Sequence, residues 1–205
     1  MKVLVICENS GTVRDAFAKR GHDAWSLDVL PTEKPGNHIQ DYVENRPLDW
    51  YRTFDLIIGH PPCTYLSIAG LHWLKKDAMG IRRARQRLAV EFFQFCYHLP
   101  CDRVCMENPM GFLNNNWKKP TQIVEPWMFG HPYTKKTGLW LRGLPKLKRV
   151  NPHYGPTEKW VRGKGPAWWG GKCEDGGSGY DWKKASLTFQ GIADAMADQW
   201  GSIPT

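Results

Sequence analysis

The chain has 205 residues, 41% of them hydrophobic, and a formal net charge of +8 at pH 7. This length suits one domain with a sizeable core, and no stretch approaches the ~18 consecutive apolar residues of a membrane span. The amino-terminal MKVLVICENS turns polar after one short strand, unlike a signal peptide, and six irregularly spaced cysteines indicate reduced thiols, so we expect a cytoplasmic protein away from membranes.

Apolar runs and helical periodicity alternate along the chain. Buried strands are expected at 2–7, 23–28, 37–43, 54–60, 102–109 and 138–143. Helices are expected from Thr12, with Gly21 as the stop, and over 79–99 and 191–200. The apolar face of the long middle helix is expected at Ile81, Ala84, Leu88, Phe92, Phe95, Cys96 and Leu99. This alternation predicts a doubly wound α/β fold, in which ligands bind beyond the carboxyl ends of the strands.

The chain is expected to divide into three parts. Residues 1–143 form the core, 144–187 form an irregular insertion rich in Gly, Trp and Lys, and 188–205 form a helix that returns to the core. The positive net charge favours a polyanionic partner. The insertion contains EKWVRGKGPAWWGGK, whose interleaved aromatic and cationic residues either stack bases and hold phosphates or build a small tryptophan-rich core.

The stretch FDLIIGHPPCTYLS ends a buried strand with two prolines, and Cys63 follows at once. Prolines fix the backbone, so the thiol is held at a defined point beyond the sheet. Glu107, Asn108 and Pro109 end the strand expected beside it. A thiolate is a strong nucleophile, and a carboxyl group in an apolar pocket has a raised pKa and can donate a proton. Cysteine and glutamate without a paired histidine do not suit a papain-type protease. They suit attack on an electron-poor ring whose nitrogen is protonated at the same moment.

A second set of polar residues follows the first two strands. CENSGTVRDAF reads as a strand, a turn and a helix start, and a helix amino terminus favours polar or anionic groups. Its single glycine is weak support for a dinucleotide site. Asp28 ends the next strand, where an acid commonly binds ribose hydroxyls; the alternative is a capping or turn aspartate.

Two motifs carry a family resemblance. DLIIGHPPCTYLSIAG resembles the Pro-Cys motif of DNA (cytosine-5) methyltransferases, and MENP resembles their Glu-Asn-Val/Pro motif, in the same order and at a matching separation. More faintly, nearly the whole chain resembles small phage-type members. The resemblance implies a Rossmann-like fold that uses S-adenosylmethionine, a DNA partner, a monomer, and the cytoplasm of a bacterium or a phage-infected host. Cys63 would attack C6 of a flipped-out cytosine and Glu107 would hydrogen-bond or protonate N3, so that C5 takes the methyl group.

The resemblance implies further site residues. Asn108 would order the loop that carries Cys63, and Lys135 matches the first arginine of the family's Gln-x-Arg-x-Arg strand. Asp28 would bind the cofactor's ribose and Asp41 its adenine amino group. The full set of cofactor-binding residues is expected to be Glu8, Asn9, Ser10, Gly11, Asp28, Val29, Asp41, His60 and Pro61. Nucleic-acid-binding residues are expected at Ser67, His72, Lys75, Lys76, Arg82, Arg83, Lys136, Arg142, Lys164 and Trp168.

The chain departs from the family pattern in three places. The Phe-x-Gly-x-Gly cofactor loop is absent, and Thr137 stands at the second arginine, so Lys135, Lys136 or Arg142 would hold the cytosine carbonyl. About 45 residues replace a whole target-recognition domain, which predicts short or relaxed sequence specificity.

Two alternatives remain open. The first is cytosine-5 modification of another substrate, such as RNA or a modified cytosine, or with an altered sulfonium cofactor. The second is a catalytically silent DNA-binding relative. A zinc site is disfavoured because the spacing of its candidate ligands lacks paired knuckles, and no metal is expected. These candidates are Cys96, His98, Cys101 and Cys105.

Overall fold

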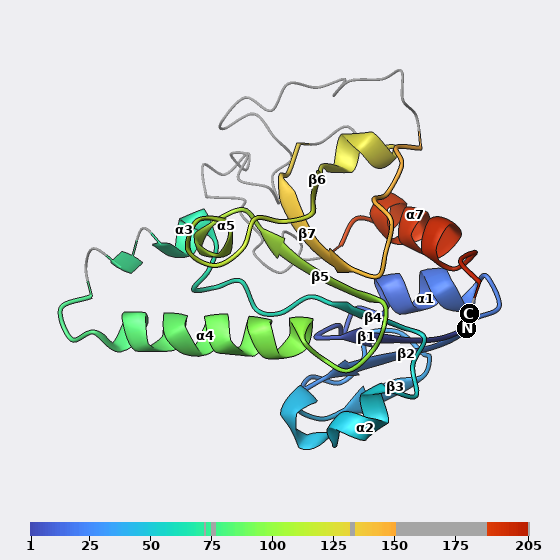
Figure 1. Ribbon diagram of the computed structural model, residues 1–205, viewed down its shortest axis with the longest axis horizontal. Helices are drawn as coiled ribbons and strands as arrows, with labels where there is room; N and C mark the ends of the chain where they lie inside the picture. The colour runs from blue at the N-terminus through green and yellow to red at the C-terminus, as the bar shows by residue number, and fades with distance from the viewer. Residues whose placement is uncertain (72, 75–76, 132–133, 151–187, 205) are drawn as a thin grey trace, which may run out of the picture.

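The computed structural model describes residues 1–71, 73–74, 77–131, 134–150 and 188–204. Within this part of the chain, seven strands form one sheet in the order β3-β2-β1-β4-β5-β7-β6 (Figure 1). Strands β1 to β5 run parallel, and β7 runs antiparallel to its neighbours β5 and β6. The strands are β1 Lys2–Ile6, β2 Asp23–Asp28, β3 His38–Gln40, β4 Leu56–Gly59, β5 Val104–Pro109, β6 Gln122–Val124 and β7 Thr137–Arg142.

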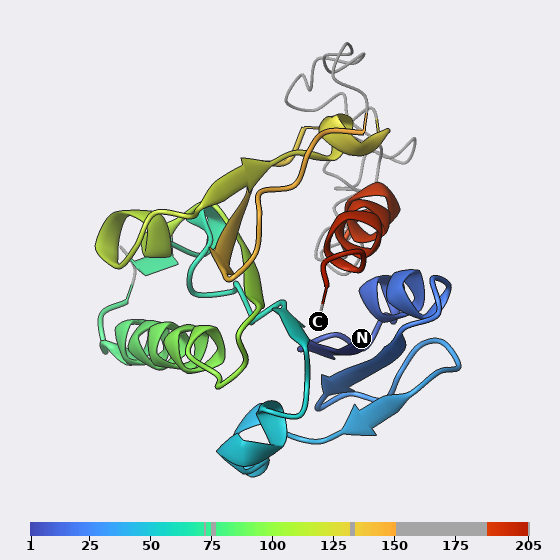
Figure 2. The same cartoon turned by 45° about the vertical axis from the view of Figure 1, so that its right-hand side comes forward.

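Helices cover both faces of the sheet. Helices α1 and α7 lie together over one face, and α4 and α2 lie over the other (Figures 1 and 2). The α-helices are α1 Thr12–Ala18, α2 Leu48–Tyr51, α3 Ile68–Leu71, α4 Ile81–Tyr97, α5 Phe112–Asn116 and α7 Gln190–Trp200. The 3-10 helices η1 Val43–Asn45 and η3 Pro126–Phe129 also lie in the described ranges. This is the doubly wound α/β fold predicted from the sequence. No helix in the described ranges is long and apolar enough to cross a membrane.

The core explains why the strands read as continuous apolar runs. Along β1, Val3 and Val5 pack with α1 and α7, whereas Leu4 and Ile6 pack on the opposite face with α4 and α2. All four side chains are fully buried. Because successive side chains of a strand point to opposite faces, a strand covered on both sides has no polar alternation.

The predicted apolar face of α4 is partly wrong. The helix buries Gln86, Phe93, Cys96 and Tyr97, while Leu88 remains 63% exposed. The Gln86 side chain donates its Nε2–H to the backbone oxygen of Tyr65 at 2.9 Å, which satisfies a polar group on the buried face. The pattern of apolar residues therefore combined a core-facing stripe with a second stripe that faces outward.

The segment after β7, which begins the predicted insertion, contacts α7. The indole Nε1 of Trp200 donates to the backbone oxygen of Pro145 at 3.0 Å, and the Gln199 side chain bonds both backbone groups of Lys148. Residues 144–150 therefore pack along α7. The rest of the predicted insertion, 151–187, lies outside the described residues.

Candidate active site

The carboxyl ends of β4 and β5 lie side by side. Gly59 pairs with Met106 in the parallel ladder, so the next residues along each strand, His60 and Glu107, stand opposite one another. Their side chains meet, with His60 Nδ1 3.2 Å from Glu107 Oε2, and both are largely buried. The two motifs singled out in the sequence are thus joined by a direct contact, which involves a histidine that we had assigned to cofactor binding.

Several contacts tie the loop of Cys63 to the end of β5. Asn108 is buried and donates its Nδ2–H to the backbone oxygen of Pro61 at 2.8 Å. The backbone N–H of Phe112 donates to Leu66 O at 2.7 Å. Gly111 lies so close that a Cβ atom there would overlap the Leu66 carbonyl oxygen. The role expected for Asn108, ordering this loop, agrees with its position.

The same loop continues into α3. The Cys63 carbonyl accepts the backbone N–H groups of Leu66 and Ser67, both at 2.9 Å, which closes a tight turn behind the thiol. Ser67 also forms an isolated bridge with Gly111, so this predicted nucleic-acid contact sits within the loop that positions the thiol. The thiol is half-buried.

Four ionisable side chains share this end of the sheet. Burial raises the pKa of the Cys63 thiol, the charge of Glu107 adds to that effect, and Lys135 opposes it. Burial disfavours the charged form of His60, but the hydrogen bond to Glu107 and the charges of Glu107 and Glu8 outweigh it and raise the His60 pKa. Lys135 and Glu107 also line one small pocket together with residues that precede α7. Three predicted catalytic residues, Cys63, Glu107 and Lys135, therefore lie within electrostatic reach of one another.

At the end of β1, Glu8 has a structural role that the sequence did not reveal. Its carboxylate is buried and accepts the backbone N–H groups of Val13 at 2.7 Å and Arg14 at 3.1 Å. These are unpaired donors at the start of α1, where a negative charge also suits the helix dipole. Of the cofactor residues predicted here, Glu8 thus caps a helix, and the Ser10 hydroxyl turns inward to Glu8 at 3.4 Å.

The backbone around these residues is unusual. Cys7 has a φ of 55°, in the left-handed region that non-glycine residues rarely occupy, and Gly11 follows with a φ of 69°. Such strain persists only where the surrounding structure enforces it, and it is common at ligand sites. It turns the chain sharply out of β1, so that Asn9 meets the next loop, where its carbonyl accepts the backbone N–H of Glu33 at 2.8 Å.

Arg14 organises the loop that follows Asp28, and sequence reasoning missed it. Its side chain is 1% exposed, and its guanidinium donates to Ser26 Oγ, Thr32 Oγ1 and the backbone oxygens of Lys34 and Pro35. Asp28 sits at the start of this loop, and burial raises the pKa of its carboxyl while the bond from the Leu30 N–H opposes the rise. Val29 follows and is nearly half exposed. Asp28 and Val29 therefore begin the loop that Arg14 holds and whose Glu33 bonds Asn9.

Asp41, predicted to bind the cofactor's adenine amino group, already has protein partners. Its carboxylate accepts from Asn45 Nδ2 at 2.7 Å and pairs with the Arg46 guanidinium at 2.8 Å, so both oxygens are engaged. These bonds, with that from the Tyr42 N–H, lower the pKa of Asp41. A contact with an adenine amino group would have to displace one of these partners.

A mainly apolar pocket of about 650 Å³ opens nearby, between α4, η1 and the loop of Cys63. Pro62 and Tyr65 come from the Cys63 loop, while Leu88, Ala89 and Phe92 come from the outward stripe of α4. This pocket explains the exposure of Leu88. The sequence signal was present, since apolar side chains recur along α4 over more than one face, but we assigned all of them to the core.

The predicted nucleic-acid residues are scattered. The Arg82 guanidinium lies 5.0 Å from the centre of the Tyr65 ring, beside the Cys63 loop, whereas the backbone N–H of Arg83 bonds Asp77 and begins α4. Lys136 is exposed just before β7. The other candidates, His72, Lys75, Lys76, Lys164 and Trp168, lie outside the described residues.

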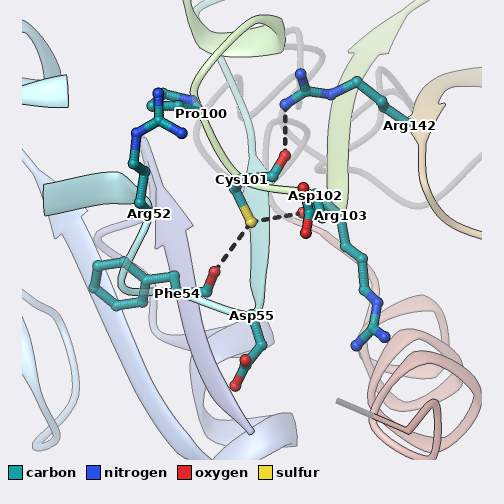
Figure 3. Close-up of a pocket in the computed structure, with 8 residues that line it drawn as sticks. All are labelled: Arg52, Phe54, Asp55, Pro100, Cys101, Asp102, Arg103 and Arg142. Atoms are coloured by element: carbon teal, nitrogen blue, oxygen red, sulfur yellow. Dashed lines mark hydrogen bonds between the residues drawn. The ribbon is translucent and has the colours of Figure 1, made fainter. Parts of the chain in front are cut away.

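Arg142 is a clear correction. It ends β7 at the opposite end of the parallel strands, where its guanidinium donates to the backbone oxygen of Leu99. It also donates to the backbone oxygen of Cys101 (Figure 3). Together with Arg52 and Arg103 it lines a separate pocket of about 430 Å³. An arginine at the amino ends of β4 and β5 cannot hold a base beside Cys63, so this part of the predicted site is wrong.

Nor do the cysteines and histidine considered for zinc form a cluster. Cys96 faces the core from α4, Cys105 is buried in β5, and Cys101 donates its thiol to Phe54 O at 3.2 Å. In the part of the chain that is described, no three cysteine, histidine or acidic side chains come together as metal ligands would.

Comparisons with known proteins give similarities to solved structures but not to sequence families. No protein-family model matches the chain, and no curated protein matches it. A solved structure of a DNMT2 triple mutant from Spodoptera frugiperda aligns with a TM-score of 0.43 and 17% sequence identity, covering 73% of this chain and 53% of that one. The chain thus matches about half the length of that protein. The strand order and the antiparallel β7 identify the architecture independently: the chain has a Rossmann-like fold of the methyltransferase type.

Proposed function

We propose that this protein is an S-adenosylmethionine-dependent DNA (cytosine-5) methyltransferase. The observation that carries the proposal is that Cys63 and Glu107 follow the ends of the adjacent strands β4 and β5, close enough for the charge of Glu107 to act on the thiol. Asn108 binds the loop of Cys63 to the end of β5. The motifs around both residues resemble those of that family. A thiol and a carboxyl group fixed at one sheet edge suit addition to a pyrimidine ring.

Different residues of the chain would have different roles in the reaction. The Cys63 thiolate adds to C6 of the target cytosine, and electron density moves from the C5–C6 double bond toward N3. Glu107, protonated when the base binds, donates its proton to N3 and so neutralises the charge that develops there. Lys135, which lines a pocket with Glu107, supplies a cation at the same place. After methylation, removal of the C5 proton and loss of Cys63 restore the aromatic ring.

The polar and apolar residues beyond β1 to β4 suit the cofactor. Asp28 would bind the ribose hydroxyls, and the strained turn at Cys7 would bring backbone groups to the same end of the strands. The pocket of Pro62, Leu88 and Phe92 would take a flat apolar ring such as adenine. Two buried polar atoms, His60 Nε2 and Asn108 Oδ1, lack hydrogen-bond partners among the described residues, as expected where a ligand completes a site. When bound, S-adenosylmethionine would supply an electrophilic methyl group.

A nucleic-acid substrate agrees with the positive net charge of the chain and with the position of the Cys63 thiol. The net charge is +8, and Arg82 and Arg85 both contact Tyr65 beside the Cys63 loop. A target base must leave its stack to reach a half-buried thiol, which costs a few kcal/mol. We infer a monomer with short or relaxed sequence specificity, working in the cytoplasm of a bacterium or an infected host.

A covalent trap tests the proposal. The protein is incubated with S-adenosylmethionine and an oligonucleotide containing 5-fluorocytosine, which blocks release of the thiol because fluorine replaces the C5 proton. We expect a denaturation-resistant complex that maps to Cys63. Cys63→Ala should bind the oligonucleotide without trapping it, and Cys101→Ser, altered at the opposite sheet edge, should trap like the wild type.

The same assay separates the alternatives. If RNA is trapped and DNA is not, the substrate is RNA. If mass spectrometry of co-expressed nucleic acids shows a different modified nucleoside, the substrate or the cofactor differs from the one proposed. Binding of DNA with no trapping and no modified cytosine would instead favour a silent DNA-binding protein. Bisulfite sequencing of host DNA after expression would then give the target sites.

A further inference from the structure

His60 stands where the thiol and the carboxyl group meet. It directly precedes Pro61-Pro62-Cys63 at the end of β4, and its Nδ1 lies 3.2 Å from Glu107 Oε2. Its side chain is only 12% exposed. A buried imidazole in contact with a carboxylate has an electrostatic effect on that carboxylate and on everything beside it.

The charged and polar groups around His60 come from each neighbouring element. Glu107 reaches it from β5, Glu8 from the end of β1, and Lys135 from the segment before β7. Thr188, which precedes α7, places its Oγ1 3.4 Å from the same Nδ1. Two acids and one lysine thus act on His60, and the nearer acid holds it by a hydrogen bond. This surplus of negative charge favours the imidazolium.

Cys63 has the opposite requirement. Its thiol must lose a proton to become a nucleophile, yet it is partly buried and feels the negative charge of Glu107. Two anions in a poorly solvated pocket repel each other, so a bare carboxylate would suppress the thiolate. A cation hydrogen-bonded to Glu107 would remove this obstacle while leaving the carboxylate in place.

We propose that His60 is a positioning residue that, as an imidazolium, fixes and neutralises Glu107 so that Cys63 can form its thiolate beside it. The Nδ1–H bond holds one carboxylate oxygen, and the other is left to take up the proton that the target base receives. The use of this effect in methyl transfer rests on the proposed function. The coupling of the three side chains does not, and it can be measured without any substrate.

The test is the pH dependence of Cys63 alkylation by iodoacetamide, followed by peptide mass spectrometry. His60→Asn keeps an N–H near the position of Nδ1 but cannot carry the charge. We expect it to slow Cys63 alkylation at pH 7 about tenfold and to move the profile to higher pH by about one unit. Glu107→Gln should move the profile to lower pH.

A double-mutant cycle shows whether His60 acts through Glu107. In the Glu107→Gln background, His60→Asn should change the alkylation rate by less than about twofold, because the charge it offsets is gone. If His60→Asn only loosened the loop of Cys63, the alkylation rate would rise at every pH and the midpoint of the pH profile would not move. An unchanged midpoint in His60→Asn, or an equal shift in both backgrounds, would overturn the proposal.

A second measurement needs no change at His60. The imidazole titration of His60, followed by NMR in wild type and Glu107→Gln, should move to lower pH when the carboxylate is removed, because burial then dominates. If the two titrations coincide, the proposal fails even where His60→Asn does not fold. If the coupling holds but no nucleic acid is trapped, the proposed function fails and this inference stands.

Discussion

The two ends of the parallel strands, called here the carboxyl edge and the amino edge of the sheet, hold similar side chains that have different roles. At the carboxyl edge Cys63 lies near Glu107 and Lys135, and at the amino edge Cys101 lies beside Asp102 and Arg142 (Figure 3). Cys101 donates its thiol to the backbone oxygens of Phe54 and Arg103. Its cation, Arg142, likewise bonds backbone oxygens.

The difference lies in what the polar groups bond. At the amino edge thiol and cation complete the hydrogen bonding of loops, so they stabilise the fold. At the carboxyl edge the ionisable groups act on one another, and burial raises the pKa of Cys63 and the His60–Glu107 bond favours the imidazolium. Residue types alone do not distinguish the edges; only the second is arranged for chemistry.

The largest effect is expected when each of these two cysteines is replaced by alanine. Cys63→Ala should lower methyl transfer more than about 10³-fold while leaving urea denaturation nearly unchanged. Cys101→Ala should do the reverse, with near-normal activity and a loss of about 1–2 kcal/mol in unfolding free energy. Equal loss of activity in both variants would remove the distinction.

Arg14 offers a stability test at the carboxyl edge. Arg14→Met keeps the length of the side chain but leaves Ser26, Thr32 and two carbonyls without their donor. We expect the unfolding free energy to fall by about 3 kcal/mol in chemical denaturation. The cofactor should also bind more weakly because the loop after Asp28 loses its anchor. A variant as stable as wild type would contradict the structure of this loop.

Two glycines provide a matched pair. A Cβ at Gly111 would overlap Leu66 O in the Cys63 loop, and one at Gly143 would overlap Asp102 O at the other edge. Both alanine variants should lose about 1–3 kcal/mol of stability. Only Gly111→Ala should also reduce turnover, by about tenfold, since it displaces the thiol. Steady-state kinetics below the melting temperature of both variants separates the two effects.

The smallest effect is expected in the apolar pocket of α4. Leu88→Ala should weaken S-adenosylmethionine binding about fivefold in calorimetry, from lost apolar contact, with little change in stability because Leu88 is largely exposed. Arg52→Ala, in the pocket at the amino edge, should leave cofactor affinity unchanged. Equal effects would mean that the α4 pocket does not belong to the cofactor site.

The sequence predicted most of the fold because its main signals were local. Strands β1, β2, β4, β5 and β7 were expected at nearly their observed positions, since strands covered on both faces of a sheet are mainly apolar. Short elements such as α2 and β6 were missed, because four or three residues carry too little periodicity.

The site was predicted unevenly for a related reason. Cys63, Glu107 and Asn108 end strands and carry specific motifs, so their convergence followed from topology. Arg142 was misplaced because an antiparallel strand sends its last residue to the far edge, and only the register reveals this. The roles of Arg14 and His60 depend on side-chain partners distant in sequence, which no local pattern encodes.

The contact between Gly111 and the Leu66 carbonyl has a consequence for how a ligand would enter. Because β5 and the thiol-bearing turn are already locked together, the conformational entropy of assembling them is lost during folding and not on association. A planar heterocycle would therefore bind to a preorganised site, and its affinity would not be reduced by the entropy cost of ordering β5 and the Cys63 turn.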